Sequence, residues 1–387
     1  MHKAGFSNQQ LLQTGNMKNA QEFRVNVPQE TLDNLEVRLR STRWPGQPEG
    51  QAWEYGTNEV YLRELVDYWL NQYDWRTQEA LLNRYPQYIA EVQGHSIHFQ
   101  YVKGQGENAK PLVLTHGWPD SYHRFHRVIS LLTQGEMSFD LIIPSIPGFG
   151  FSERSALPTK KIAALWKELV TVNLGYESFY AAGGDMGALI TRELATNFSD
   201  VVEAVHFTDI GYPMGDEDPE TMTQAEQEFA EFVQQWWMQQ GSYAMIHSTK
   251  PQSVAFGFND SPVGLAAWIL NFISIGVDPD GIEAAFGGRD ALLTNIMIYW
   301  VTQTIATSMR MYKVDQKELQ GGSPSSAKSD VPAGIALFPR EAQFPREWAE
   351  RFVRVERFTK MSEGGHFAAL EVPDAYVAEL KTFFSKY

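Results

Sequence analysis

The feature that most constrains the fold is a succession of eight short β-rich runs, separated by stretches of helical character, that begins after Tyr85. The first two runs, 88–92 and 97–102, can pair as a hairpin through the turn at 93–95. The later runs are residues 112–115, 140–144, 178–182, 202–207, 334–338 and 353–358. They are almost continuously apolar, which is typical of parallel strands covered by helices on both faces. The pattern therefore predicts an α/β protein with a mostly parallel eight-stranded sheet.

The residues that precede this sheet are predicted to form helices rather than strands. Leucines recur at three- and four-residue spacing over 32–39, with Thr31 placed to cap a helix and Trp44-Pro45 placed to end it. A second amphipathic stretch covers 58–73. We therefore expect an N-terminal extension of helices and meandering chain over residues 1–85.

A long insertion separates the sixth and seventh runs. It covers 209–331, more than 120 residues, and must fold as a layer of its own because structureless loops of that length are uncommon. Helical segments are expected at 224–237, 263–275 and 291–312, and the Gly- and Ser-rich stretch 321–329 is expected to link this lid back to the sheet. The predicted parts are thus an N-terminal extension (1–85), a first half of the core (86–210), a helical lid (211–330) and a second half of the core (331–387).

The composition excludes several classes of function. The chain has 387 residues, with 32 Lys and Arg against 47 Asp and Glu, and the net charge of −15 argues against binding to nucleic acid or to an anionic membrane surface. It contains no cysteine, which excludes disulfides, cysteine metal clusters and thiol catalysis. We find no signal peptide and no apolar run of the ~20 residues that cross a bilayer. We expect a cytoplasmic protein without a membrane span.

The strongest candidate for a reactive group is Asp185. A short strand runs into Gly183-Gly184-Asp185-Met186-Gly187, and a helical run follows. Small residues around one side chain are typical of a nucleophile elbow, a strained strand-to-helix turn that lifts the side chain above the sheet. Here that side chain is a carboxylate, and no Gly-x-Ser-x-Gly sequence occurs, so serine chemistry lacks its nucleophile. The alternative is a glycine-rich turn in which Asp185 only caps the helix.

Two further segments fit a catalytic site around this turn. The apolar run 112–115 leads directly into His116-Gly117, so the next backbone N–H can point toward the elbow and form half of an oxyanion hole. His366 lies in a glycine-containing loop after the last strand, where a catalytic base would belong. With its reference pKa near 6.5, this imidazole is expected to be mostly neutral at pH 7.

The acid that would orient this base has two candidates. Glu341 follows the seventh strand, and its carboxylate could hold His366 in one tautomer and stabilise the imidazolium. Asp209, just past the sixth strand, is a weaker candidate for the same role. The chain order of nucleophile, acid and base is one that hydrolases with such an elbow use.

Other clusters do not indicate a cofactor or a metal. His116, His123 and His126 lack the spacing of a His-Glu-x-x-His or similar motif. Neither a Gly-x-Gly-x-x-Gly nor a Walker sequence is present. The pair Trp236-Trp237 is interpreted as lid packing rather than as a ligand cage. We predict a site that uses no metal and no cofactor.

Taken together, these motifs resemble the epoxide hydrolases of the α/β-hydrolase fold, specifically the microsomal-type branch that carries an N-terminal extension. The resemblance covers nearly the whole chain from about Phe23. It rests on Arg38-Leu39-Arg40-Ser41-Thr42-Arg43-Trp44-Pro45, His116-Gly117-Trp118-Pro119, Gly183-Gly184-Asp185, Asn259-Asp260-Ser261-Pro262-Val263-Gly264-Leu265-Ala266-Ala267, Phe338-Pro339-Arg340-Glu341 and Gly364-Gly365-His366-Phe367.

The resemblance implies a role for each matching position. It implies that Asp185 is the nucleophile, that His366 is the base and that Glu341 is its acid partner. It implies an oxyanion hole made by the backbone N–H groups of Trp118 and Met186. It also implies two lid tyrosines, Tyr243 and Tyr312, that donate to the epoxide oxygen; without the resemblance each would be an ordinary lid residue.

The resemblance also implies the ligands. The expected substrates are a small apolar epoxide and water, the product is a vicinal diol, and detoxification or aromatic hydrocarbon catabolism is the expected setting. A homodimer is a further expectation. Two alternatives stay open: a haloalkane dehalogenase, which also uses an Asp elbow but needs N–H donors for its halide, and a catalytically silent hydrolase fold that binds a ligand or a protein.

Two positions depart from the family pattern. Met186 stands where a Trp commonly follows the nucleophile; the backbone donor survives, but a change in the pocket wall is expected. Asp120 stands where a Gly often follows the Pro, and Asp tolerates a left-handed backbone better than most residues. The resemblance therefore does not extend to the substrate preference.

Overall fold

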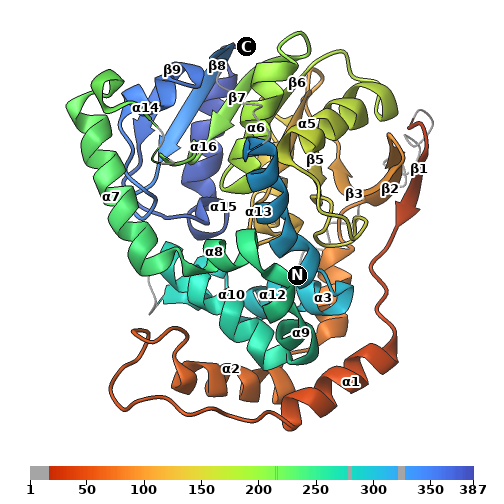
Figure 1. Cartoon of the computed structure of the whole chain (residues 1–387). Coiled ribbons are helices and arrows are strands. Elements are labelled where there is room, and N and C mark those ends of the chain that lie inside the picture. Colours follow the sequence, from red (N-terminus) through yellow and green to blue (C-terminus); the bar gives the residue numbers. More distant parts are fainter. Residues whose placement is uncertain (1–16, 214, 216, 278–280, 321–326) are drawn as a thin grey trace.

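One mixed sheet organises the chain. The computed structural model describes residues 17–213, 215, 217–277, 281–320 and 327–387 (Figure 1). Within these residues nine strands form a single sheet in the order β1-β2-β3-β5-β4-β6-β7-β8-β9. The strands are β1 (Ala20–Phe23), β2 (Gln87–Val92), β3 (His95–Val102), β4 (Lys110–Thr115), β5 (Phe139–Pro144), β6 (Phe179–Gly183), β7 (Val202–Phe207), β8 (Ser329–Leu337) and β9 (Val353–Lys360). From β5 to β9 every neighbouring pair is parallel, as the continuous apolar runs indicate.

The antiparallel edge of the sheet confirms one prediction and corrects another. The hairpin of β2 and β3 turns through Gln93 and Gly94, both with positive φ, as a two-residue hairpin turn requires. The prediction of an N-terminal region without strands is wrong, because residues 20–23 form β1 and pair with β2. Four residues are too short for an alternating pattern to be recognised, and pairing with an existing edge stabilises them.

Helices cover both faces of the parallel part of the sheet. They are α4 (Ile129–Thr133), α5 (Thr159–Glu168), α6 (Met186–Asn197), α14 (Arg346–Glu350), α15 (Ala368–Glu371) and α16 (Pro373–Phe384), with the short turns η3 (Tyr122–Phe125) and η4 (Leu169–Asn173). Helix α6 buries most of its side chains against the sheet. The expected α/β-hydrolase fold is therefore confirmed.

Between β7 and β8 the chain forms a helical layer over one end of the sheet, seen below it in Figure 1. Its elements are η5 (Pro219–Thr221), α7 (Gln224–Gln240), α8 (Ser242–Thr249), α9 (Pro251–Asp260), α10 (Pro262–Gly276), α11 (Ile282–Phe286), α12 (Arg289–Thr302) and α13 (Ile305–Gln320). The prediction of a single helix over 291–312 is wrong. Helices α12 and α13 meet near Gln303, where φ is +56° and the backbone leaves the helical region. Most of the expected linker, 321–326, lies outside the described residues; Ser329 already belongs to β8. None of the described helices is long and apolar enough to cross a membrane.

The N-terminal extension packs against this layer on the side away from the sheet, as Figure 1 shows for α1 (Gln29–Arg40) and α2 (Glu59–Asn71). Helix α1 begins two residues before Thr31, after Pro28, so the predicted cap is wrong. The guanidinium of Arg38 donates to the Asp260 carboxylate, with a distance of 2.6 Å between Nη1 and Oδ1. Two of the motifs that carry the family resemblance thus meet at the joint between extension and lid. A third helix, α3 (Trp75–Leu82), leads from the extension into β2.

Candidate active site

The predicted site residues gather at the carboxyl end of the parallel strands. Trp118 follows β4, Asp185 follows β6, Glu341 follows β8 and His366 follows β9. Because β4, β6, β7, β8 and β9 are consecutive parallel neighbours, their carboxyl ends meet at one edge of the sheet. The chain runs from β4 to its neighbour β5 on one side and then crosses to β6 on the other side of β4, so the strand order reverses at β4. Open α/β sheets bind ligands at such switch points.

The turn between β6 and α6 has the geometry of a nucleophile elbow. Asp185 has φ +57° and ψ −131°, a strained backbone that a non-glycine residue adopts only where the surroundings impose it. Close packing imposes it here: a Cβ on Gly187 would lie 2.1 Å from the carbonyl oxygen of Thr115, and one on Gly117 would lie 2.3 Å from Oδ1 of Asp185. The glycines therefore allow β4 and the elbow to approach.

The Asp185 carboxylate faces the loop after β4 and makes no capping hydrogen bond to α6. The alternative prediction, in which Asp185 only caps the helix, is therefore wrong. Its Oδ1 accepts a hydrogen bond from the backbone N–H of Trp118, with an N···O distance of 2.8 Å. The N–H of Met186 also faces the carboxylate. Burial raises the Asp185 pKa above its usual value, although His366 and these two N–H groups oppose the shift. Both predicted oxyanion donors thus already contact the carboxylate.

His366 links the two acidic residues of the site. Its Nδ1 lies 2.7 Å from Oε2 of Glu341, and its Nε2 lies 4.0 Å from Oδ2 of Asp185. Glu341 is buried, and its other oxygen accepts hydrogen bonds from the Ala342 N–H at 3.0 Å and from the Tyr212 hydroxyl at 3.3 Å. This arrangement fixes the tautomer of His366, since Nδ1 carries the proton that Glu341 accepts.

The expectation of a mostly neutral His366 at pH 7 is wrong for the resting protein. Burial alone would lower the pKa of this imidazole, but the charge and hydrogen bond of Glu341, together with the charge of Asp185, outweigh burial and raise the pKa to about 9. The imidazolium in turn holds the pKa of Glu341 below its usual value against the effect of burial. A sequence cannot give this result because the two carboxylates become neighbours only in the fold.

Asp209, the weaker candidate for the acid, has a different partner. Its Oδ2 accepts a hydrogen bond from the backbone N–H of Asp185 and its Oδ1 accepts one from Gly211 at 3.3 Å. Burial, reinforced by the nearby charges of Glu341 and Asp185, raises the pKa of Asp209 to about 7. Glu341 therefore has the contact with His366 that the acid needs, and Asp209 supports the elbow.

The two predicted lid tyrosines lie side by side above the elbow. Tyr243, on α8, stacks on Trp118 with ring centroids 5.6 Å apart, and Tyr312, on α13, packs edge-on to Tyr243 at 6.0 Å. Burial and the Asp185 charge raise the pKa of Tyr243 above its usual value, and burial with the charges of Tyr243 and Asp185 raises that of Tyr312. Both hydroxyls therefore stay protonated at neutral pH and can donate.

A cavity of about 150 Å³ joins these groups. Asp185, His366, Glu341 and Tyr243 line it, together with aromatic and aliphatic lid residues. Tyr312 is not among its lining residues, but it packs against Tyr243 and Trp118, which are. The further lining residues are Trp118, Pro119, Tyr212, Phe232, Val233, Trp236, Phe272, Ile275, Gly276, Arg340, Ala342 and Phe367.

The cavity walls revise two expectations about lid packing and pocket shape. Trp236 lines the cavity, with its ring nearly parallel to that of Tyr212 at a centroid distance of 6.4 Å, so lid packing is not its whole role. Met186 does not line the cavity, so the expected change in the pocket wall does not come from direct contact. Tyr212 was missed in the sequence because no motif marks it; it follows β7 at the same edge of the sheet.

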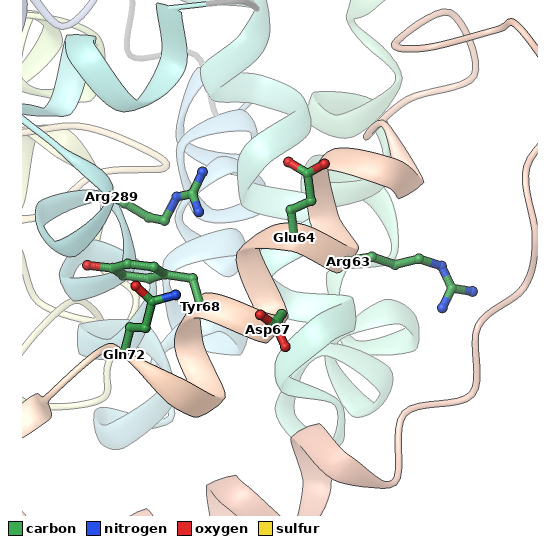
Figure 2. Close-up of a pocket in the computed structure, with 6 residues that line it drawn as sticks. All are labelled: Arg63, Glu64, Asp67, Tyr68, Gln72 and Arg289. Carbon is green, nitrogen blue, oxygen red and sulfur yellow. The ribbon is translucent and has the colours of Figure 1, made fainter.

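Two larger hollows lie away from this chemistry. One, of about 490 Å³, is bordered by α2 and Arg289 (Figure 2). Its two arginines pair with residues outside the hollow, Arg63 with Glu59 and Arg289 with Glu283, both at 2.7 Å. The other, of about 750 Å³, lies between the extension and α10. Within the described part of the chain, no three His, Asp or Glu side chains are arranged to hold a metal ion. The site at the elbow is therefore where we place the chemistry.

Comparison with known proteins identifies the family. Residues 20–125 match the family model described as the epoxide hydrolase N terminus, and residues 110–285 match that of the alpha/beta hydrolase fold. Epoxide hydrolase 1 of Sus scrofa is 33% identical over 404 residues, which cover 93% of this chain and 87% of that protein. The chain belongs to the epoxide hydrolases.

Some solved structures of epoxide hydrolases share nearly the whole architecture. The juvenile hormone epoxide hydrolase of the silkworm Bombyx mori superposes with a TM-score of 0.87 at 27% identity, covering 98% of this chain and 96% of the other. The Aspergillus niger epoxide hydrolase gives a TM-score of 0.82 at 28% identity, covering 96% and 98%. The predicted family and enzyme class are therefore confirmed, and neither a haloalkane dehalogenase nor a silent binding protein is supported.

Proposed function

We propose that this epoxide hydrolase works through a covalent ester on Asp185, formed with the help of Tyr243 and Tyr312 and hydrolysed with the help of His366 and Glu341. The observation that carries the proposal is that the Trp118 N–H already binds Oδ1 of Asp185 while Nε2 of His366 faces Oδ2. One carboxylate oxygen thus occupies the oxyanion hole and the other is left to attack carbon.

In the first step, Oδ2 of Asp185 attacks an epoxide carbon and the bond from that carbon to the epoxide oxygen breaks. A carboxylate needs no base to attack an alkyl carbon, but the departing oxygen needs a proton. Tyr243 or Tyr312 supplies it, and a positioned general acid of this kind contributes about 10² to 10⁴ in rate. The products of the step are a hydroxy ester on Asp185 and a tyrosinate.

In the second step, water attacks the ester carbonyl carbon, Cγ of Asp185, and gives a proton to Nε2 of His366. The negative charge develops on Oδ1, where the N–H groups of Trp118 and Met186 stabilise it; one such donor is worth roughly 3 to 4 kcal/mol. Collapse returns the proton to the leaving diol oxygen. The remaining proton on the Asp185 carboxyl passes to His366 and restores the resting imidazolium, so the net reaction adds one water to the epoxide.

Formation of the ester itself prepares His366 as the base. In the resting protein the Asp185 charge helps to raise the pKa of this imidazole. Esterification removes that charge, so the pKa of His366 falls. The imidazolium then gives its Nε2 proton to the tyrosinate that ring opening leaves, and the neutral ring can act as the base in the second step. Glu341 keeps its contact and continues to orient the ring.

We expect small apolar epoxides as substrates. The cavity of about 150 Å³ is smaller than the roughly 300 Å³ at which pockets for drug-sized ligands begin. Aromatic side chains such as Trp236, Phe272 and Phe232 make up much of its wall, and Arg340 is the one Lys or Arg side chain among its described lining residues. A cytoplasmic location and a homodimer stay predictions.

Replacement of Asp185 by Ala is expected to abolish both turnover and the covalent adduct. The variant keeps the oxyanion donors and both tyrosines but removes the carboxylate that attacks and becomes the ester. Diol formation from a panel of small epoxides, with intact-protein mass spectrometry in parallel, tests this. Full activity of Asp185→Ala would refute the proposal, and chloride release from chloroalkanes by the native protein would favour dehalogenase chemistry instead.

Replacement of Glu341 by Gln is expected to move the acidic limb of ester hydrolysis to lower pH. His366 must be neutral to accept a proton, so hydrolysis rises with pH, and in the native protein this limb lies between the reference value of about 6.5 and the resting value of about 9. Glu341→Gln removes the charge that raises the pKa of His366, so the limb moves to lower pH. Because the ring of His366 is also less well oriented, the plateau rate of hydrolysis falls as well. Decay of preformed ester, followed from roughly pH 5 to 10, is the measurement. A limb that stays in place or moves to higher pH would contradict this assignment of Glu341.

A further inference from the structure

A buried arginine that the mechanism does not use lies beneath the active-site loops. Arg124, in η3, has a side chain that is 3% exposed. A buried guanidinium is costly unless charged or polar groups pair with it, so its partners are informative. Its Nη1 donates to Oδ2 of Asp120 and its Nη2 donates to the backbone carbonyl oxygen of His366. One side chain thus contacts both the loop after β4 and the loop that carries the base.

The Asp120 end of this pair fixes the oxyanion loop. Its Oδ1 accepts a hydrogen bond from the backbone N–H of Gly117 at 2.8 Å and lies 3.6 Å from Nδ1 of His116. That same Nδ1 lies 3.0 Å from the carbonyl oxygen of Gly117, which shares a peptide unit with the Trp118 N–H. The orientation of the oxyanion donor is therefore tied to Asp120, and through it to Arg124.

The other end fixes the base and touches the elbow. The guanidinium lies over the ring of Phe367, 5.4 Å from its centroid, directly after His366. A Cβ placed on Gly184 would lie 3.3 Å from Nη2, so the same group also lies against the residue before the nucleophile. The chain segments that carry the donor, the nucleophile and the base come from three different strands and converge on this one side chain.

We propose that Arg124 is a positioning residue for the second half-reaction. It holds the base His366 and the oxyanion donor, the Trp118 N–H, at the correct distance from each other on the two sides of the ester. The inference rests on the proposed ester mechanism. Ring opening needs the carboxylate and the lid tyrosines, and the described hydrogen bonds of Arg124 go to neither of them but to Asp120 and the His366 carbonyl. Hydrolysis needs in addition the water activated at Nε2 and the carbonyl oxygen held by Trp118 at the same time. A misplacement of about 1 Å in such a site can cost 10²-fold in rate.

The test separates the two half-reactions in the Arg124→Met and Arg124→Lys variants. Rapid mixing with excess epoxide, quenching and intact-protein mass spectrometry give the rate of ester formation and the rate of its decay. For Arg124→Met we expect decay to slow by about 10²-fold while formation changes only a few-fold, so that ester accumulates. Arg124→Lys keeps the charge but cannot reach both partners in fork geometry, so it should also accumulate ester, and it serves as the test if Arg124→Met does not fold.

Arg127→Met is the matched control. Arg127 also donates from its guanidinium to a backbone carbonyl, that of Leu370 in α15, but it makes no contact with Asp120 or His366. Its loss should leave the ratio of formation to decay unchanged. Equal losses in both steps for the Arg124 variants, or no accumulation of ester, would overturn the inference. Absence of ester even in a His366→Gln control would instead contradict the proposed function on which this inference rests, because His366 would then be needed before the second step.

Discussion

Incubation of the His366→Gln variant with an epoxide should raise the mass of the intact protein by the mass of that epoxide. The variant keeps Asp185, the oxyanion donors and the lid tyrosines, so the ester still forms. Its hydrolysis loses the group that takes a proton from water, which costs about 10² to 10⁴ in rate. Diol formation should therefore stop after about one equivalent, and peptide mapping should locate the added mass at Asp185.

The matched control for this variant is His95→Gln. His95 also pairs with a glutamate, with 2.6 Å between its Nδ1 and Oε1 of Glu153, but it lies in the hairpin strand β3 and does not line the cavity. It should turn over epoxide at the native rate and carry no added mass. If His366→Gln also stays unmodified while its turnover is lost, ester formation itself depends on His366 and the assignment of His366 to the second step is wrong.

Replacement of both Tyr243 and Tyr312 by Phe should abolish ring opening. The rings that pack on Trp118 remain, but no hydroxyl is left to protonate the departing oxygen. We expect the rate of ester formation to fall by about 10² to 10⁴-fold, with smaller losses in the single variants because one donor remains. Single-turnover mixing measures this rate directly, and in the His366→Gln background the double change should prevent the added mass.

A second pair of tyrosines provides the control for this loss of hydroxyls. The Tyr68 hydroxyl donates to Asp290 at 2.8 Å, and the Tyr73 hydroxyl hydrogen-bonds with that of Thr294 at 3.0 Å. Both tyrosines lie in the N-terminal extension and do not line the active-site cavity. The Tyr68→Phe/Tyr73→Phe protein should lose some stability and keep its rate of ring opening. Full ring opening in the lid double variant would show that other groups supply the proton.

The sequence predicted those parts of the protein that depend on local patterns. The apolar runs predicted the parallel strands, and the Gly-rich turn predicted the elbow at Asp185, because these patterns record burial and tight backbone geometry directly. The four-residue strand β1 was not predicted, because it depends on pairing with β2. The helix break at Gln303 was not predicted either, because no glycine or proline marks it in the sequence. The positions of the lid tyrosines came from family motifs, because an isolated tyrosine carries no local signal.

The electrostatics of the site could not be predicted from the sequence. His366 has a pKa of about 9 because Glu341 and Asp185, from two other strands, lie on either side of its ring. The partners of Arg124 are equally non-local, with His366 lying 242 residues further along the chain. Residue type and spacing indicate which groups are available, but the charges that tune them depend on distances that only the fold sets.

The most direct test of the covalent account is a single turnover in water enriched in oxygen-18, with the native protein in excess over the epoxide. The account predicts that the diol carries no label, because its new oxygen comes from the Asp185 carboxylate. The peptide that contains Asp185 should instead gain one heavy oxygen, from the water that attacks Cγ. Label in the diol and none in that peptide would mean that water attacks the epoxide directly, and the ester mechanism would be wrong.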